Sequence, residues 1–223
     1  MQQRVPGKAD VFGTLRRMAF LLLNVLTTIC LLASGSTAQQ LPTSGRPLAT
    51  KQKILIVYLS RTNNTKAVAE MIQQKVGGRM VALELETPYP ADYHMTVQQV
   101  VRENETGYLP PLKTKIERME EYDVVFLGFP TWDMQLPPPV KSFLHQYDLK
   151  GKTLIPFNTN GGYGPGSSFE TVRELCPKNT ILKGFTIRGG SERDGEYLAI
   201  KGARAEEARK NVSNWLAEIG MLN

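Results

Sequence analysis

The sequence predicts an α/β fold in which a parallel β-sheet is covered by helices on both faces. Residues 54–59 read Ile-Leu-Ile-Val-Tyr-Leu and are apolar on both faces, as a central parallel strand should be. Strand and helix patterns then alternate to the end of the chain. The last helix has the clearest apolar face, made of Ala205, Ala208, Val212, Trp215, Leu216 and Ile219, so Trp215 is expected in the core.

The other elements follow in order from local patterns. After the first strand, apolar residues at helical spacing end at Gly77-Gly78, which predicts a helix there. Weaker alternation indicates a second strand over 80–85. A helix is expected over 92–104. Further strands are expected over 124–129, 153–157 and 181–187, with helices over 140–147 and 167–175 between them. In such sheets a ligand binds outside the carboxyl ends of the strands, near the topological switch point.

The N-terminal segment has the pattern of an export signal. Arg16-Arg17 precede an apolar stretch over 18–33, and small residues follow up to Ala38. We therefore expect a signal peptide over 1–38, a linker over 39–51 and one domain over 52–223, exported to a bacterial periplasm. The paired arginines also resemble a twin-arginine signal. An uncleaved anchor is the alternative, although the stretch is short of the roughly 20 residues that a membrane span needs.

Composition excludes several classes of function. The chain carries a net charge of +6, half of it in the leader, and its basic residues are scattered without interleaved aromatics, which argues against nucleic-acid binding. Neither a metal-ligand cluster nor a serine or cysteine triad is recognisable, so no catalytic or metal-binding residue is predicted.

The loop after the first strand has the chemistry of an anion site. It reads Ser60-Arg61-Thr62-Asn63-Asn64-Thr65 and opens a helix, whose first N–H groups lack internal partners and lie at the positive end of the helix dipole. The hydroxyl groups can add hydrogen bonds to a phosphate. The sequence has no GxxxxGK[ST] and no GxGxxG, so we expect a terminal phosphate that is held without reacting. The alternative is that Thr62 or Thr65 merely caps the helix.

Two more loops follow strands and complement the first. Pro130-Thr131-Trp132-Asp133 offers a tryptophan outside any periodic core position. Thr159-Asn160-Gly161-Gly162-Tyr163-Gly164 offers backbone N–H groups that a ligand can approach closely, and a second aromatic ring. A phosphate site, aromatic walls and backbone donors together describe a flat heteroaromatic on a phosphorylated stalk, which is flavin mononucleotide (FMN).

These motifs resemble those of the flavodoxin family, and of its small bacterial flavodoxin-like members, over residues 53–222. The first loop matches the family pattern S/T-x-T-G-N-T except that Asn63 takes the glycine place, a mild change because asparagine tolerates a left-handed backbone. The resemblance implies a three-layer αβα sandwich with a five-stranded parallel sheet in the order 2-1-3-4-5. It also implies FMN bound by the three loops, with Trp132 stacked on or edging the isoalloxazine and Tyr163 near the ring.

The resemblance implies an exported redox protein that transfers electrons through non-covalent FMN to a partner protein or a small-molecule acceptor. Carriers of this family usually have a strongly acidic face around the flavin, whereas these loops carry charges of both signs. One alternative is therefore an NAD(P)H-dependent FMN oxidoreductase acting on quinones or similar acceptors. The other is a flavin-free binding protein that keeps only the fold.

Overall fold

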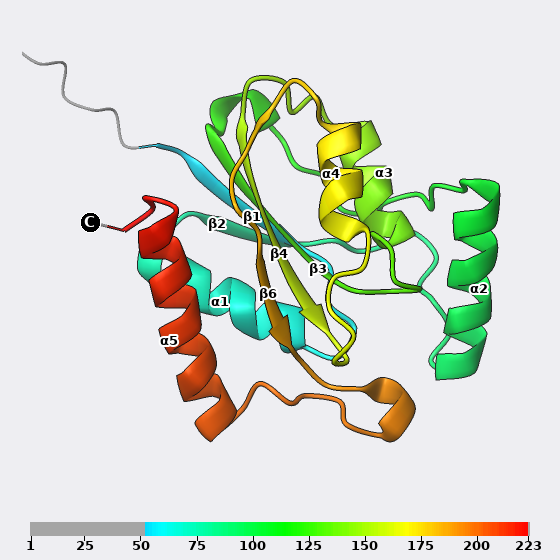
Figure 1. Ribbon diagram of the computed structural model, residues 1–223. Helices are drawn as coiled ribbons and strands as arrows, with labels where there is room; N and C mark the ends of the chain where they lie inside the picture. The colour runs from blue at the N-terminus through cyan, green and yellow to red at the C-terminus, as the bar shows by residue number, and fades with distance from the viewer. Residues whose placement is uncertain (1–51, 223) are drawn as a thin grey trace, which may run out of the picture. The chain divides into compact units, whose positions relative to one another are not determined.

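A parallel β-sheet forms the centre of residues 52–222, which are the residues that the computed structural model describes (Figure 1). Its strand order is β2-β1-β3-β4-β5, and every neighbouring pair is parallel. The predicted order 2-1-3-4-5 is thus confirmed. The signal peptide over 1–38 and the linker over 39–51 lie outside the described residues and stay predictions.

The elements have the following bounds. The strands are β1 (Ile54–Tyr58), β2 (Arg79–Ala82), β3 (Val124–Pro130), β4 (Thr153–Asn160), β5 (Thr180–Ile181) and β6 (Phe185–Arg188). The α-helices are α1 (Asn64–Val76), α2 (Tyr93–Thr106), α3 (Pro138–Gln146), α4 (Ser168–Leu175) and α5 (Ala203–Glu218). Two short 3₁₀ helices are η1 (Met119–Glu121) and η2 (Glu192–Asp194).

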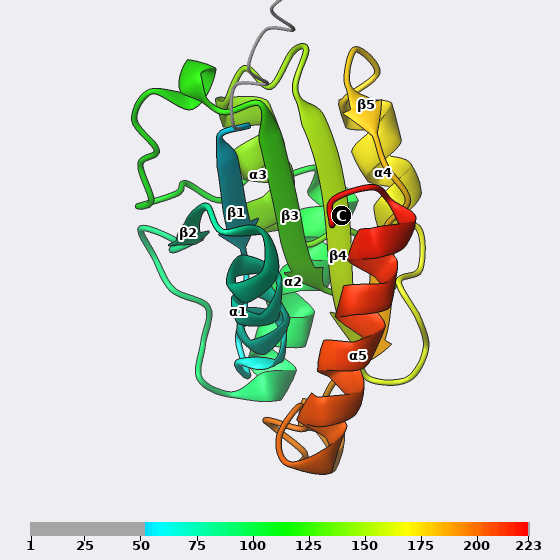
Figure 2. The same ribbon diagram turned by 90° about the vertical axis from the view of Figure 1, so that its left-hand side faces the viewer.

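The two faces of the sheet pack against different helices, because side chains alternate along each strand. On one face, Ile56 and Phe126 pack with residues of α1 and α5, including Trp215, which is buried as predicted. On the other face, Leu55 and Leu127 pack with residues of α3 and α4. Figure 2 shows α1 and α5 side by side in front of the sheet. These are the layers of the predicted αβα sandwich.

The fifth strand is interrupted, which the sequence did not indicate. β5 pairs Ile181 with Leu154, whereas β6 pairs Phe185 with Phe157, so the fifth strand holds one more residue than β4 between these pairs. A one-residue bulge reverses which face of the sheet each following side chain of the strand lies on. Ile181 consequently packs on the α3–α4 face and Phe185 on the α1–α5 face. The sequence pattern indicated one continuous strand over 181–187, so this switch was not predicted.

The segment between β2 and β3 also differs from its prediction. β2 ends at Ala82, three residues before the expected end, and Leu85 forms an isolated antiparallel bridge with Leu112 instead. The chain then turns into α2, whose N-terminus is capped by the Asp92 carboxylate, which accepts a hydrogen bond from the N–H of Met95 (2.8 Å). In Figure 1, α2 stands outside the α3–α4 layer. This placement lets α2 form a wall of the site.

Candidate functional site

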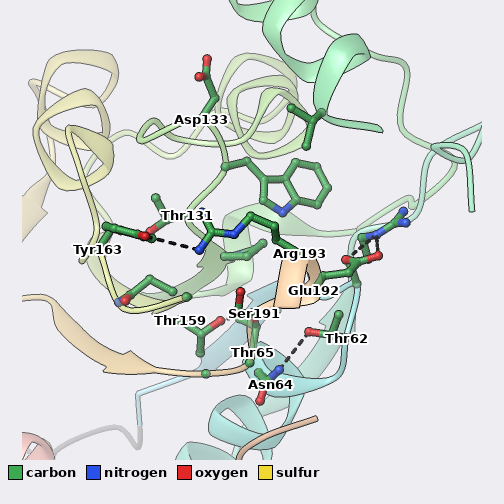
Figure 3. Close-up of a pocket in the computed structure, with 18 of the residues that line it drawn as sticks. Thr62, Asn64, Thr65, Thr131, Asp133, Thr159, Tyr163, Ser191, Glu192 and Arg193 are labelled. Carbon is green, nitrogen blue, oxygen red and sulfur yellow. Dashed lines mark hydrogen bonds and ion pairs between the residues drawn. The ribbon is translucent and has the colours of Figure 1, made fainter. Parts of the chain in front are cut away.

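A pocket of about 340 Å³ lies where β1, β3 and β4 end (Figure 3). All the cofactor-binding residues predicted from the sequence line it except Ser60, Asn63 and Gly162. Two further segments complete its wall. They are one side of α2, with Tyr93, Thr96, Val97 and Val100, and the segment after β6, with Gly189, Gly190, Ser191, Glu192 and Arg193. Met134 of the second loop also lines the pocket.

The first loop has the backbone shape that its sequence predicts. Asn63 immediately precedes α1 and has φ 64° and ψ 3°, the left-handed conformation expected in the glycine place. Its side chain makes no capping hydrogen bond. Instead the hydroxyl of Ser60 accepts from the N–H of Lys66 (3.2 Å). Ser60 thus satisfies the third N–H group of α1, whereas the first two, those of Asn64 and Thr65, have no hydrogen-bond partner among residues 52–222 and belong to residues that line the pocket.

The two threonines of the first loop do not act as helix caps. The Thr62 hydroxyl accepts from the Asn64 side chain (2.9 Å), and the Thr65 hydroxyl is 2.8 Å from that of Thr159 on β4. Within residues 52–222, neither hydroxyl accepts a hydrogen bond from a helical N–H. Thr65 is 2% exposed, so its hydroxyl mainly joins α1 to β4, whereas Thr62 is only partly buried and faces the pocket.

Asn64 is tied to the C-terminal part of the chain. Its side-chain amide donates to Thr62 and to the carbonyl oxygen of Tyr197 (2.6 Å). Its side-chain oxygen accepts from the N–H groups of Ala199 (2.9 Å) and Ile200 (3.1 Å). At 3% exposure this side chain has both ends occupied within the protein. Only its backbone is available to a ligand.

The second loop presents Trp132 on a tight turn. Asp133 and Met134 have φ values of 51° and 54°, and the N–H of Gln135 donates to the carbonyl oxygen of Trp132 (2.9 Å). Two consecutive left-handed residues without glycine store strain of roughly 1–2 kcal/mol each, a feature that concentrates at functional sites. The Asp133 carboxylate points away from the pocket and accepts from Asn104 of α2 (3.1 Å) (Figure 3). The turn is thereby attached to the wall helix.

The indole of Trp132 is supported from behind by Tyr89. The two rings meet edge to face, with centroids 5.2 Å apart. The Tyr89 hydroxyl donates a hydrogen bond to the carboxylate of Glu103, which is 6% exposed and also accepts from Gln99 (2.8 Å). Burial and the bond to Glu103 raise the pKa of Tyr89 far above its usual value. Trp132 therefore has little freedom to leave the pocket wall.

The third loop is organised by Asn160. Its side-chain oxygen accepts from the N–H groups of Gly162 (2.9 Å) and Gly164 (3.1 Å), so these two predicted donors are used inside the loop. Gly161 and Tyr163 also line the pocket, and within residues 52–222 their N–H groups have no hydrogen-bond partner. Tyr163 is 70% exposed, and its ring lies under the guanidinium of Arg193 at 5.9 Å from the centroid.

The segment after β6 is the part of the site that sequence reasoning missed. Arg193 reaches across the pocket to Tyr163 (Figure 3), and a hydrogen bond to Asp194 raises the pKa of Arg193 and lowers that of the carboxyl. Glu192 accepts hydrogen bonds from Arg61. The sequence signal that could have located this segment is the pair Gly189-Gly190 directly after an expected strand. In the structure, a side chain on Gly190 would clash with the carbonyl oxygen of Tyr197.

Other site types find no support in the described part of the chain. Residues 52–222 contain no group of three His, Cys, Asp or Glu side chains that could hold a metal ion. Among the helices of these residues, none has the length and apolarity to cross a membrane.

The fold and the pocket define a class: an α/β protein with a doubly wound parallel sheet and a pocket at the carboxyl ends of its central strands, where proteins of this class bind their ligands. Residues 53–197 match the family model described as Flavodoxin. The chain belongs to the flavodoxin family, which confirms the resemblance seen in the sequence. No curated protein gives a significant sequence match.

Solved structures agree with this assignment. A protein of Bacteroides eggerthii DSM 20697 described as a flavoprotein is 28% identical, with a TM-score of 0.61 over 75% of this chain and 98% of that one. A similarly described protein of Bacteroides uniformis ATCC 8492 is 25% identical, with the same TM-score over 74% and 98%. A flavoprotein of Lactobacillus acidophilus NCFM, solved in complex with FMN, is 22% identical, with a TM-score of 0.54 over 65% and 98%, and shares the fold.

Proposed function

We propose that this protein is an exported redox protein that transfers electrons through non-covalently bound FMN. The observation that carries the proposal is the meeting of three features in one pocket: the open N-terminus of α1 beside Thr62, the supported ring of Trp132, and the backbone donors of the third loop. Family membership and the FMN complex of the Lactobacillus acidophilus relative support the choice of cofactor.

The residues present fit FMN in their chemistry. The first N–H groups of α1, with the Thr62 hydroxyl, would hold the phosphate at the positive end of the helix dipole. Trp132, held by Tyr89, would cover the flavin ring, and the N–H groups of Gly161 and Tyr163 would donate to its polar edge. FMN supplies the electron chemistry, whereas the protein supplies binding, orientation and the electrostatics around the ring.

The charges at the pocket mouth favour an acceptor that is not strongly charged. Arg61 is paired with Glu192 and Arg193 with Asp194, so opposite charges lie side by side instead of forming one acidic face. Such a mouth steers a highly charged partner weakly. Val97, Met134 and Tyr163 line the pocket and are also well exposed, which gives the rim an apolar character.

This apolar rim favours a second candidate function, an NAD(P)H-dependent FMN oxidoreductase that reduces quinones or similar planar acceptors. The two candidates differ in their source of electrons. Stoichiometric oxidation of NAD(P)H by the FMN-loaded protein in the presence of a soluble quinone would favour the enzyme. Reduction only by dithionite or a protein donor would favour the carrier.

The test of the proposal uses the full chain expressed in a bacterium. The periplasmic and cytoplasmic fractions are separated, and the purified protein is examined by N-terminal sequencing and visible absorption. We expect periplasmic protein beginning at Gln39, a flavin spectrum, and tight binding of FMN to the apoprotein. A colourless protein that does not bind added FMN would refute the redox function. Cytoplasmic protein with an uncleaved N-terminus would refute export.

A further inference from the structure

Arg61 occupies the variable place in the phosphate-loop pattern, and its guanidinium joins three segments of the chain. Its Nε donates to both carboxylate oxygens of Glu192, at 2.9 and 2.8 Å. Its two terminal nitrogens donate to the backbone carbonyl oxygens of Pro90 (2.9 Å) and Ala91 (2.7 Å). Every nitrogen of the guanidinium therefore has an acceptor within the protein.

Both segments that Arg61 reaches continue into walls of the pocket. Glu192 lies in η2 and lines the pocket itself, next to Gly189 and Gly190. Pro90 and Ala91 lead directly into α2, whose residues Tyr93 and Val97 also line the pocket. These two walls are the parts of the site that neither β1, β3 nor β4 positions.

The ion pair is shielded enough to act as a structural element. The side chains of Arg61 and Glu192 are only 20% and 14% exposed, whereas the other salt bridges among the described residues are considerably more open. Removing one partner of such a pair leaves a poorly solvated charge behind, so its loss is felt far more than that of a surface pair. The carboxylate also neutralises the guanidinium, which leaves little net positive charge to attract a phosphate.

We propose that Arg61 is a positioning residue: through Glu192 and the carbonyl groups of residues 90 and 91 it fixes the two pocket walls formed by α2 and by residues 189–193, and it is not a phosphate ligand. The inference rests on the proposed binding of FMN. Phosphate recognition then falls to Thr62 and the first N–H groups of α1. The geometry is specific to arginine, because a lysine ammonium cannot span three acceptors as the planar guanidinium does.

The two roles of Arg61 predict different ligand selectivity. A phosphate ligand contributes to the binding of FMN but not to that of riboflavin, which lacks the phosphate. A positioning residue contributes to both, because both flavins need the walls in place. The ratio of the two dissociation constants therefore separates the roles, and general loss of structure is monitored independently by far-UV circular dichroism.

The experiment compares Arg61→Gln, Glu192→Gln and the double variant with the wild-type protein, with FMN and riboflavin titrated by flavin fluorescence. The double variant decides, because it contains no unpaired carboxylate that would repel the phosphate. We expect the double variant to weaken both flavins by a similar factor, about tenfold. The double variant should be no weaker than the worse single one, as for two residues of one contact. Hydrogen exchange of the apoprotein should become faster over residues 189–198.

Two further variants keep the test decisive. Arg209→Gln removes an exposed ion pair with Glu206 on α5 and should leave both affinities unchanged. Arg61→Lys keeps the positive charge but not the planar guanidinium, and it should weaken the binding of both flavins. This variant provides the test even if the double variant does not fold. Selective loss of FMN binding in the double variant, or near wild-type affinities in Arg61→Lys, would overturn the inference. Wild-type protein that binds neither flavin would instead refute the proposed function.

Discussion

Replacing Asn64 with alanine tests whether the first loop is held by the C-terminal segment. The substitution removes the side-chain oxygen that accepts from the N–H groups of Ala199 and Ile200, which are both 4% exposed residues. A buried donor left without a partner costs about 1–3 kcal/mol, so two of them should lower the free energy of unfolding by about 4 kcal/mol. That is a large part of the roughly 5–15 kcal/mol that stabilises a typical domain.

The assay is urea unfolding of the apoprotein, followed by tryptophan fluorescence. With a slope of roughly 2 kcal/mol per molar urea, the midpoint should fall by about 2 M. Asn214→Ala is the matched control, because Asn214 is exposed on α5 and its replacement should change the midpoint little. A shift below about 0.5 M for Asn64→Ala would refute the reasoning, since it would mean that water replaces the lost acceptor without penalty.

Three further predictions concern the same site. Asn63→Ala should lower the free energy of unfolding by about 1–2 kcal/mol because φ is positive there, whereas Asn63→Gly should not; urea midpoints decide. Thr62→Ala should weaken FMN more than riboflavin, about tenfold in fluorescence titrations, and equal losses would contradict a phosphate site. The pKa of Tyr89 is raised in the folded state, so the free energy of unfolding should fall as pH rises above about 10, where the unfolded side chain ionises. Tyr89→Phe should make the free energy of unfolding depend less on pH in urea titrations at pH 9–11. An unchanged dependence on pH would contradict the raised pKa.

The strands and helices themselves could be predicted from local patterns, whereas the order of the strands was implied by the resemblance to the flavodoxin family. Residues 54–59 are apolar on both faces, and the stripe that contains Trp215 repeats at helical spacing, so each element carries its own signal. The left-handed backbone at Asn63 was also predictable, since the motif marks that position and asparagine tolerates it.

The interrupted fifth strand and the short second strand were not predictable in this way. The run over 181–187 has the composition of a strand, but its register against β4 shifts by one residue to send Ile181 and Phe185 to opposite faces. β2 ends early because the segment around Leu112 pairs with Leu85. Both outcomes depend on a partner far away in the chain, which no local pattern encodes.

The sequence by itself determined the fold class, the family and three loops of the site, because hydrophobic periodicity and loop chemistry are local properties. Only the tertiary structure decided what each side chain in those loops does. Arg61 and Asn64 belong to the same hydroxyl-rich motif as Thr62, yet their side chains form hydrogen bonds with residues far along the chain. Arg61 contacts Glu192, and Asn64 contacts residues 197, 199 and 200. Hydrogen-bonding capacity is a property of a residue, whereas the partner that takes it is set by packing, so ligand-binding and structural roles separate only when the chain has folded.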